Sequence, residues 1–292
     1  MSETFLALFL VVLFELAVVT PSVAAEGWSL SGSMGAETRI FLHEPQFPAQ
    51  LSGAQGALLL NPELRYRSRD RRNLVRFAPN VRIDSRDRKR SLVDVTELVW
   101  TYVGDDWETV TGINKVFWGV TESRHLVDIV NQTDLAEDID GEEKLGQPMF
   151  SIATQRDWGR VDAFILTGFR ERTFPGSEGR LRAPLPVDVD NPEYESGAQE
   201  NHVDYALRYT HYLGDWDIGL SGFRGTGREP RQRQDAAGNM LIPIYDQIAQ
   251  FGADLQYTRD AMLYKFEGIV REGQGDTFTA AVAGFEYTLY QL

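Results

Sequence analysis

Charged side chains that recur at alternate positions of apolar segments are the residues of this chain best suited to do chemistry. In residues 73–84, for example, Arg76 and Arg82 alternate with Phe77 and Val81. Alternate side chains of a strand share one face, so each such segment has a charged face and an apolar face. The charged set is Arg39, Arg65, Arg67, Arg76, Arg82, Arg160, Arg208, Lys265, Glu37, Glu63, Asp84, Asp162, Asp204, Asp254 and Glu267.

Opposed basic and acidic ladders that face water create a transverse field for ions. We therefore favour a hydrated pathway for these residues, and a narrow interior filled by salt bridges is the alternative. Residues 65–72 and 82–90 are also rich in Arg and Asp. We interpret them as a solvated turn and a solvated loop beside a charged membrane surface, with capture of an anionic ligand as the alternative.

The acidic run at residues 137–143 has oxygen ligands of the kind that calcium prefers. Its core, Asp138-Ile139-Asp140-Gly141-Glu142, does not have the spacing of a twelve-residue EF-hand loop. A solvated acidic loop is the interpretation we favour, and we expect no metal and no cofactor.

Few residues of the chain have the spacing of a catalytic site. Ser123 and His125 lie two positions apart with Asp128 nearby, but a catalytic triad requires convergence in space, and no Gly-x-Ser-x-Gly motif is present. Neither a phosphate-cradling glycine loop nor a dinucleotide fingerprint occurs. We therefore expect that the protein is not an enzyme.

The elements that must position the charged ladders are strands. Alternation predicts about twelve of them: residues 28–42, 57–67, 73–84, 92–103, 107–117, 149–155, 159–169, 203–213, 216–223, 251–257, 262–270 and 277–289. Pro62 and Pro79 interrupt this pattern, because proline removes a donor from a strand ladder. In the segment 159–169, we expect Ile165 and Phe169 to face outward and Arg160 and Asp162 to face inward.

The connections alternate in length. Long or moderate ones (43–53, 85–91, 118–147, 171–201, 225–246 and 272–276) are separated by short ones (68–72, 104–106, 156–158, 214–215 and 258–260). Outer-membrane barrels have short turns on one rim and longer loops on the other, whereas a soluble β-sandwich or propeller has no reason to sort loops in this way. An all-β, antiparallel transmembrane β-barrel is therefore the predicted fold, alone or as part of a larger barrel.

The first residues predict export. The apolar run 5–20 is followed by Pro21-Ser22-Val23-Ala24-Ala25, a small-residue ending of the cleavable type. We predict a signal peptide over residues 1–25 and a barrel over residues 26–292, located in the cell outer membrane. A single anchoring helix is the alternative, although the run is short for a bilayer span.

The amino-acid composition argues against several classes of protein and of binding site. With a net charge of −14, the chain is poorly suited to bind nucleic acid, and without cysteine it forms no disulfide and no thiolate metal site. Its 16 Phe, 11 Tyr and 6 Trp suit the aromatic girdles of a membrane barrel.

Residues 112–148 carry a resemblance to a known class. A strand runs into Trp118-Gly119 and then into residues rich in Asn and Asp, such as Asn131 and Asp134. This segment resembles Gram-negative outer-membrane porins and uncharacterised porin-like families, in which the third external loop often narrows the lumen. The resemblance implies passive uptake with the 118–147 loop as constriction, and it makes Arg124, Asp128, Asp134, Asp138 and Asp140 the constriction candidates. Further lumen candidates, from alternation, are Arg65, Arg76, Arg82, Arg160, Arg208, Glu63, Asp162 and Asp204.

The end of the chain departs from this class. Outer-membrane barrels commonly end in an aromatic residue, whereas this chain ends Tyr290-Gln291-Leu292, with Leu292 out of step with Tyr287 and Leu289. We expect a carboxy-terminally incomplete copy of a longer barrel, and a complete twelve-strand barrel is the alternative.

The function we expect is a porin-like ion channel for passive transport of small polar or ionic solutes. A non-conducting barrel that binds a partner or ligand through loops 171–201 and 225–246 is the second hypothesis, and a soluble secreted β-protein is the third. The expected partners are outer-membrane lipid and lipopolysaccharide, the barrel-assembly machinery and small solutes, with a homo-oligomer left open.

Overall fold

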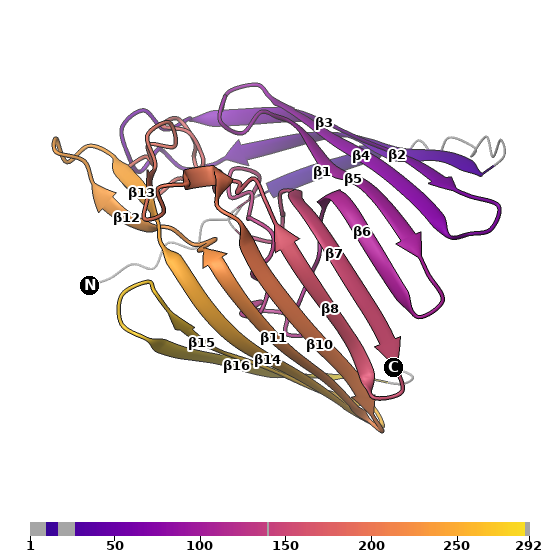
Figure 1. Cartoon of the computed structure of the whole chain (residues 1–292). Helices are drawn as coiled ribbons and strands as arrows, with labels where there is room; N and C mark the ends of the chain where they lie inside the picture. Colours follow the sequence, from indigo (N-terminus) through magenta and orange to yellow (C-terminus); the bar gives the residue numbers. More distant parts are fainter. Residues whose placement is uncertain (1–9, 17–26, 139, 290–292) are drawn as a thin grey trace.

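One curved antiparallel sheet dominates the computed structural model, which describes residues 10–16, 27–138 and 140–289 (Figure 1). Within these ranges the only helix is a 3-10 turn at Gln199–Asn201, so the all-β prediction is confirmed. No helix of the described ranges has the length and apolar character that a membrane span needs.

The sheet contains 13 of the described strands, in the order in which they follow along the chain. They are β1 (Leu10–Leu16), β2 (Trp28–Phe41), β3 (Gly53–Arg67), β4 (Asn73–Asp84), β5 (Leu92–Val103), β6 (Trp107–Asn114), β7 (Gln147–Arg156), β8 (Gly159–Leu166), β10 (Asp204–Leu213), β11 (Trp216–Thr226), β14 (Gln247–Arg259), β15 (Met262–Glu272) and β16 (Phe278–Tyr287). All strands of this sheet after β1 correspond to the segments predicted by alternation.

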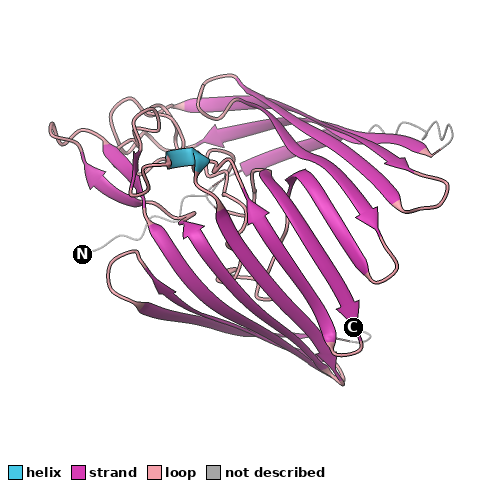
Figure 2. Ribbon diagram, viewed as in Figure 1, coloured by secondary structure: helices cyan, strands magenta, loops and turns pink. Residues whose placement is uncertain are grey.

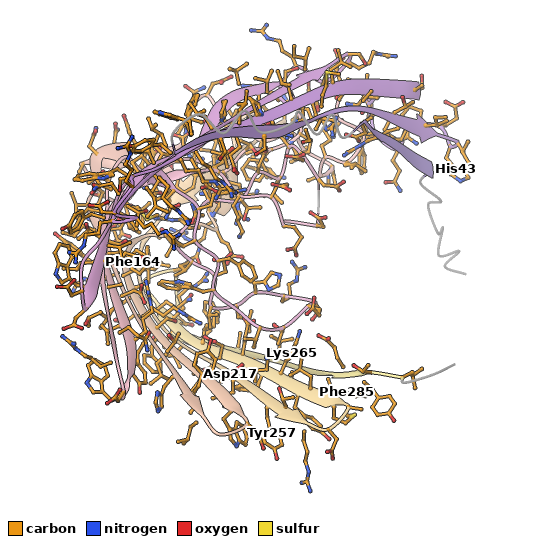
Figure 3. The ribbon with its side chains drawn as sticks, turned by 90° about the vertical axis from the view of Figure 1, so that its right-hand side faces the viewer. His43, Phe164, Asp217, Tyr257, Lys265 and Phe285 are labelled. Carbon is orange, nitrogen blue, oxygen red and sulfur yellow. The ribbon has the colours of Figure 1, made fainter. Side chains whose placement is uncertain are left out.

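The two faces of the sheet differ as the alternation requires. In β7, Met149, Ser151 and Ala153 are buried, whereas Phe150 and Ile152 between them are exposed. The strands form an open C-shaped wall, and Lys265 lies on its inner side (Figure 3). Large apolar side chains remain exposed on the outer side: Leu30, Met34, Leu58, Leu60, Phe77, Ile83, Leu98, Phe150, Ile152, Ile165, Leu207, Phe251, Phe266 and Val270.

The two prolines lie where the sheet tolerates them. The β3–β4 pairing has a gap between Leu60↔Val81 and Leu64↔Phe77, and Pro62 falls in this gap. Pro79 also falls there, and the register between β4 and β5 shifts at the same residue. A missing donor costs little at such an irregularity, so neither proline argues against its strand.

The connections sort by length, as predicted. The short turns lie at one end of the sheet, and the long connections lie at the opposite end (Figures 1 and 2). The turns are held tightly, for example by Gly104 N–H donating to Trp107 O at 2.8 Å. This arrangement gives the sheet a turn rim and a loop rim.

Part of the loop rim is a second, small sheet that the sequence did not predict. The 3-stranded sheet joins β12 (Arg231–Gln234), β13 (Leu241–Tyr245) and β9 (Glu193–Tyr194). It unites the connection after β8 with the connection after β11, and we call residues 167–203 and 227–246 the cap. Phe169 lies in the cap, 5% exposed, with its ring centroid 5.0 Å from that of Tyr245. The expectation that Phe169 faces outward is therefore wrong, because β8 ends at Leu166 and the chain turns into the cap.

The two edges of the large sheet do not pair with each other within the described ranges. β16 pairs with β15, and β2 carries β1 on its outer edge. β1 belongs to the apolar run predicted to be a signal peptide, and the predicted cleavage region near Ala25 lies outside the described residues, as does Leu292. The leader and the incomplete end stay predictions, and cleavage near Ala25 would leave β2 as the edge strand.

Candidate functional site

The connection between β6 and β7 folds back onto the inner face of the sheet. We call residues 115–146 the inner loop, residue 139 excepted. Val127 and Val130 of this loop are 0% exposed. They belong to an apolar cluster with Phe164 of β8, Phe223 of β11 and Ile269 of β15. An apolar contact of this kind holds the loop against the second half of the sheet.

Glu267 of β15 holds the inner loop by its backbone. Its carboxylate is fully buried, and Oε1 accepts hydrogen bonds from the N–H of Val120 at 2.8 Å and of Thr121 at 2.9 Å. Oε2 accepts a third bond from Val127 N–H at 3.2 Å. Gly119 precedes this contact with φ +131°, and a Cβ atom there would lie 2.8 Å from Glu267 Oε1. The glycine therefore allows the loop backbone to approach the carboxylate.

Arg82 of β4 binds the opposite side of the inner loop. Its guanidinium is 1% exposed, and it donates to Asp134 at 2.7 Å and also to Glu137. Arg90 lies beside it and pairs with Glu37 at 2.6 Å and with Asp84 at 2.8 Å. These residues form a buried ion-pair network between the first strands and the acidic end of the loop.

The middle of the inner loop is held by polar side chains. Asn131, 1% exposed, donates to Asn114 O and Leu145 O, both at 2.9 Å, and accepts from Val116 N–H at 2.9 Å. The bonds to Asn114 O and Val116 N–H occupy backbone groups at the end of β6, which explains why β6 ends at Asn114 and not at Phe117 as predicted. Arg228 of the cap donates to Val130 O at 3.0 Å.

Burial perturbs two carboxyl groups of the inner loop. It raises the pKa of Asp128, although Lys144 Nζ lies 3.2 Å from Oδ2 and lowers that pKa in part. Burial also raises the pKa of Glu137 against the opposing charge of Arg82. Both groups therefore take up protons more readily than an exposed carboxyl group does.

The predicted constriction candidates all lie on the inner loop, but in different environments. Asp134 and Asp128 are buried in the contacts described above, and Asp138 accepts from Arg39 Nη2 at 3.2 Å. Arg124 and Asp140 are exposed and line a cavity of about 220 Å³ beside the loop. The structure thus brings the five residues to one loop on the inner face, and only some of them face open space.

The lumen candidates on the strands are paired with opposite charges on the inner face. Arg76 bridges Glu63 and Glu97, each at 2.6 Å, and Arg65 also contacts Glu63. Arg160 pairs with Asp162 at 2.7 Å. Arg208 makes two bonds of 2.9 Å to Asp254, and its guanidinium lies 5.3 Å from the ring centre of Trp118 in the inner loop. Asp204 accepts from Arg228 at 2.7 Å.

Sequence reasoning missed several residues of this site. Arg90 and Arg228 are each 3% exposed, and Arg82 is 1% exposed. The interpretation of residues 82–90 as a solvated loop is therefore wrong for Arg82 and Arg90, because Asp134 and Glu137 of the inner loop neutralise Arg82, and Glu37 together with the nearby Asp84 neutralises Arg90. Alternation placed Glu267 inward but contained no signal for its role in holding the loop.

Comparison with known proteins adds no family. No family model matches the chain, and no curated protein is significantly similar to it.

Proposed function

We propose that the chain is an outer-membrane, porin-like channel for passive diffusion of small polar or ionic solutes, with the inner loop as its constriction. One observation carries this proposal: a long loop crosses the inner face of a curved sheet and is held on both sides. Arg82 of β4 binds its acidic end, and Glu267 of β15 binds its start. A loop held in this way narrows the interior without filling it, since open cavities remain on both sides of it.

The outer face supports a membrane location for the sheet. Exposed apolar residues of this number on one face are unusual for a soluble protein and suit contact with lipid. Aromatic pairs also follow the turn rim, at strand ends separated in sequence: Trp28–Tyr66, Tyr102–Trp107, Trp158–Tyr209 and Trp216–Tyr257. Such a row matches the aromatic girdle at one membrane interface of a barrel.

The unpaired edges of the large sheet bear on how the sheet closes into a barrel. Unpaired N–H and C=O groups of an edge strand are costly in hydrocarbon, where no water satisfies them. A barrel in the membrane therefore requires that the edges of this sheet pair with each other or are covered by further strands.

The test is conductance of the purified protein in a planar lipid bilayer. We expect discrete current steps, and we expect Asp138→Asn with Asp140→Asn to change the reversal potential in a salt gradient toward anions. Asp157→Asn, in the exposed turn after β7, is the matched control and leaves the reversal potential unchanged. Absence of current steps from folded protein would contradict the proposal.

The cap supports a second candidate, a non-conducting barrel that binds a partner or ligand. Its two connections form one folded unit that also contacts other loops, with Arg180 donating to Leu51 O at 3.1 Å and Lys89 pairing with Asp190 at 2.8 Å. This candidate predicts no current steps and loss of binding when residues 227–246 are deleted.

A further inference from the structure

Three arginines meet in the wall of the cavity of about 220 Å³ that lies between the inner loop, the cap and β15. Arg172 and Arg228 come from the cap, and Arg271 comes from β15. A single water needs roughly 10–15 Å³ of such space, so the cavity has room for a small solute group.

The carboxylates in contact with these arginines are fewer than the arginines. Arg228 pairs with Asp204 at 2.7 Å, and Arg271 pairs with Glu229 at 2.8 Å. Among the residues that the structure describes, no carboxylate lies within ion-pair distance of Arg172, whose Nε donates to the amide oxygen of Gln132 at 3.2 Å. Glu229 attracts Arg172 only from a greater distance.

Two further observations indicate that this wall lacks an acceptor. The Nη2 atom of Arg228 is buried and has no hydrogen-bond partner, in a side chain only 3% exposed. Burial and the neighbouring charge of Arg271 lower the pKa of Arg172. A buried donor without an acceptor and a partly buried cation without a counter-charge each cost free energy, and an anion bound in the cavity would supply the counter-charge that Arg172 lacks.

We propose that this cavity binds the anionic group of a small solute, a carboxylate or a phosphate, through Arg172, Arg228 and Arg271. The guanidinium groups match these anions because planar, paired N–H donors fit two oxygens at once. The other charged residues that line the cavity are Glu229, which pairs with Arg271, and five residues of the inner loop that lie outside the arginine wall: Arg124, Asp128, Asp140, Glu142 and Lys144. The inference rests on the proposed function, since a solute reaches this position through the channel.

The experiment separates the site from the channel. Purified folded protein in detergent is titrated calorimetrically with inorganic phosphate and, separately, with acetate at constant ionic strength. We expect saturable binding of at least one anion, weakened about tenfold by Arg172→Gln, because one charge-assisted contact is lost. Binding of phosphate but not of acetate identifies the anionic group of the solute as a phosphate, and binding of acetate but not of phosphate identifies it as a carboxylate.

Two further variants complete the test. Arg88→Gln removes the same charge from an exposed position of the loop after β4 and should bind as the wild type does. Arg172→Lys keeps the positive charge but lacks the planar pair of N–H donors, so it should bind the anion more weakly than the wild type does. This variant tests the site where Arg172→Gln does not fold. Conductance without saturable binding, or equal binding by wild type and both Arg172 variants, overturns the anion site alone. Binding without conductance leaves the site and rejects the channel.

Discussion

Removal of the Glu267 carboxylate is expected to release one side of the inner loop while the sheet stays intact. The side chain projects from β15 onto the loop, and the backbone of β15 pairs independently with β14 and β16. Glu267→Ala therefore removes the contact with the loop but none of the backbone pairing of the sheet.

The magnitude follows from the hydrogen bonds. Three backbone N–H groups, those of Val120, Thr121 and Val127, lose their acceptor in Glu267→Ala. At about 1 kcal/mol or more for each unsatisfied group, the docked loop loses at least about 3 kcal/mol, or a factor of about 100 in its docked population. Glu267→Gln keeps an oxygen for Val120 and Thr121 and loses the acceptor for Val127, so its effect should be about a third as large in free energy.

The assay is single-channel conductance together with limited proteolysis of residues 115–146. We expect larger and noisier current steps and faster cleavage in Glu267→Ala, and smaller changes in Glu267→Gln. Glu272→Gln, at the exposed end of the same strand, is the matched control. Wild-type conductance, cleavage rate and thermal midpoint in Glu267→Ala would refute the reasoning that this carboxylate holds the loop.

Three other predictions concern the same loop. Arg82→Gln leaves Asp134 and Glu137 without their buried cation and should lower the free energy of unfolding by about 3–5 kcal/mol. Denaturant titration measures this loss, with Arg88→Gln as the control, and a loss as small as that of the control would contradict the prediction. Gly252→Ala places a Cβ 2.6 Å from Ser221 Oγ and 2.9 Å from Val127 Cγ1, so it should destabilise by about 1–3 kcal/mol, whereas Gly222→Ala meets nothing within 4 Å and should be neutral. Burial raises the pKa of Asp128 above its ordinary 3.8, so the folded state holds this proton where the unfolded chain has lost it. The Asp128 contribution to the unfolding free energy therefore grows as pH falls through the raised pKa and stops changing below the ordinary value. This contribution to the slope of thermal midpoint against pH is negative, so Asp128→Asn should make the slope more positive in this pH range, and an unchanged slope would argue against this.

The pattern of residues was sufficient to predict the strands because their signal is local. Side chains in a strand alternate between faces regardless of what lies opposite, so Arg76 and Phe77 reveal their faces without knowledge of the fold. The β4 and β5 bounds match the predicted segments, and the alternation of long and short connections is confirmed.

The short strands of the cap could not be predicted in this way. β9 has two residues and pairs in parallel with β13, from a different connection. Such a strand has no alternation of its own, and its partner is distant in sequence. The burial of Phe169 depends on the same cap and escaped prediction for the same reason.

The sequence by itself determined the all-β class, the strands of the large sheet after β1 and which charges share a face, because each depends on residues close together in the chain. Only the tertiary structure decided which charges meet. Arg82 lies far in sequence from Asp134, and Arg172 lies far from Arg271, yet in each case the fold brings the two side chains to one site. Ion pairing and burial depend on distances across the sheet, so the inner loop and the arginine wall became visible only once the chain was folded.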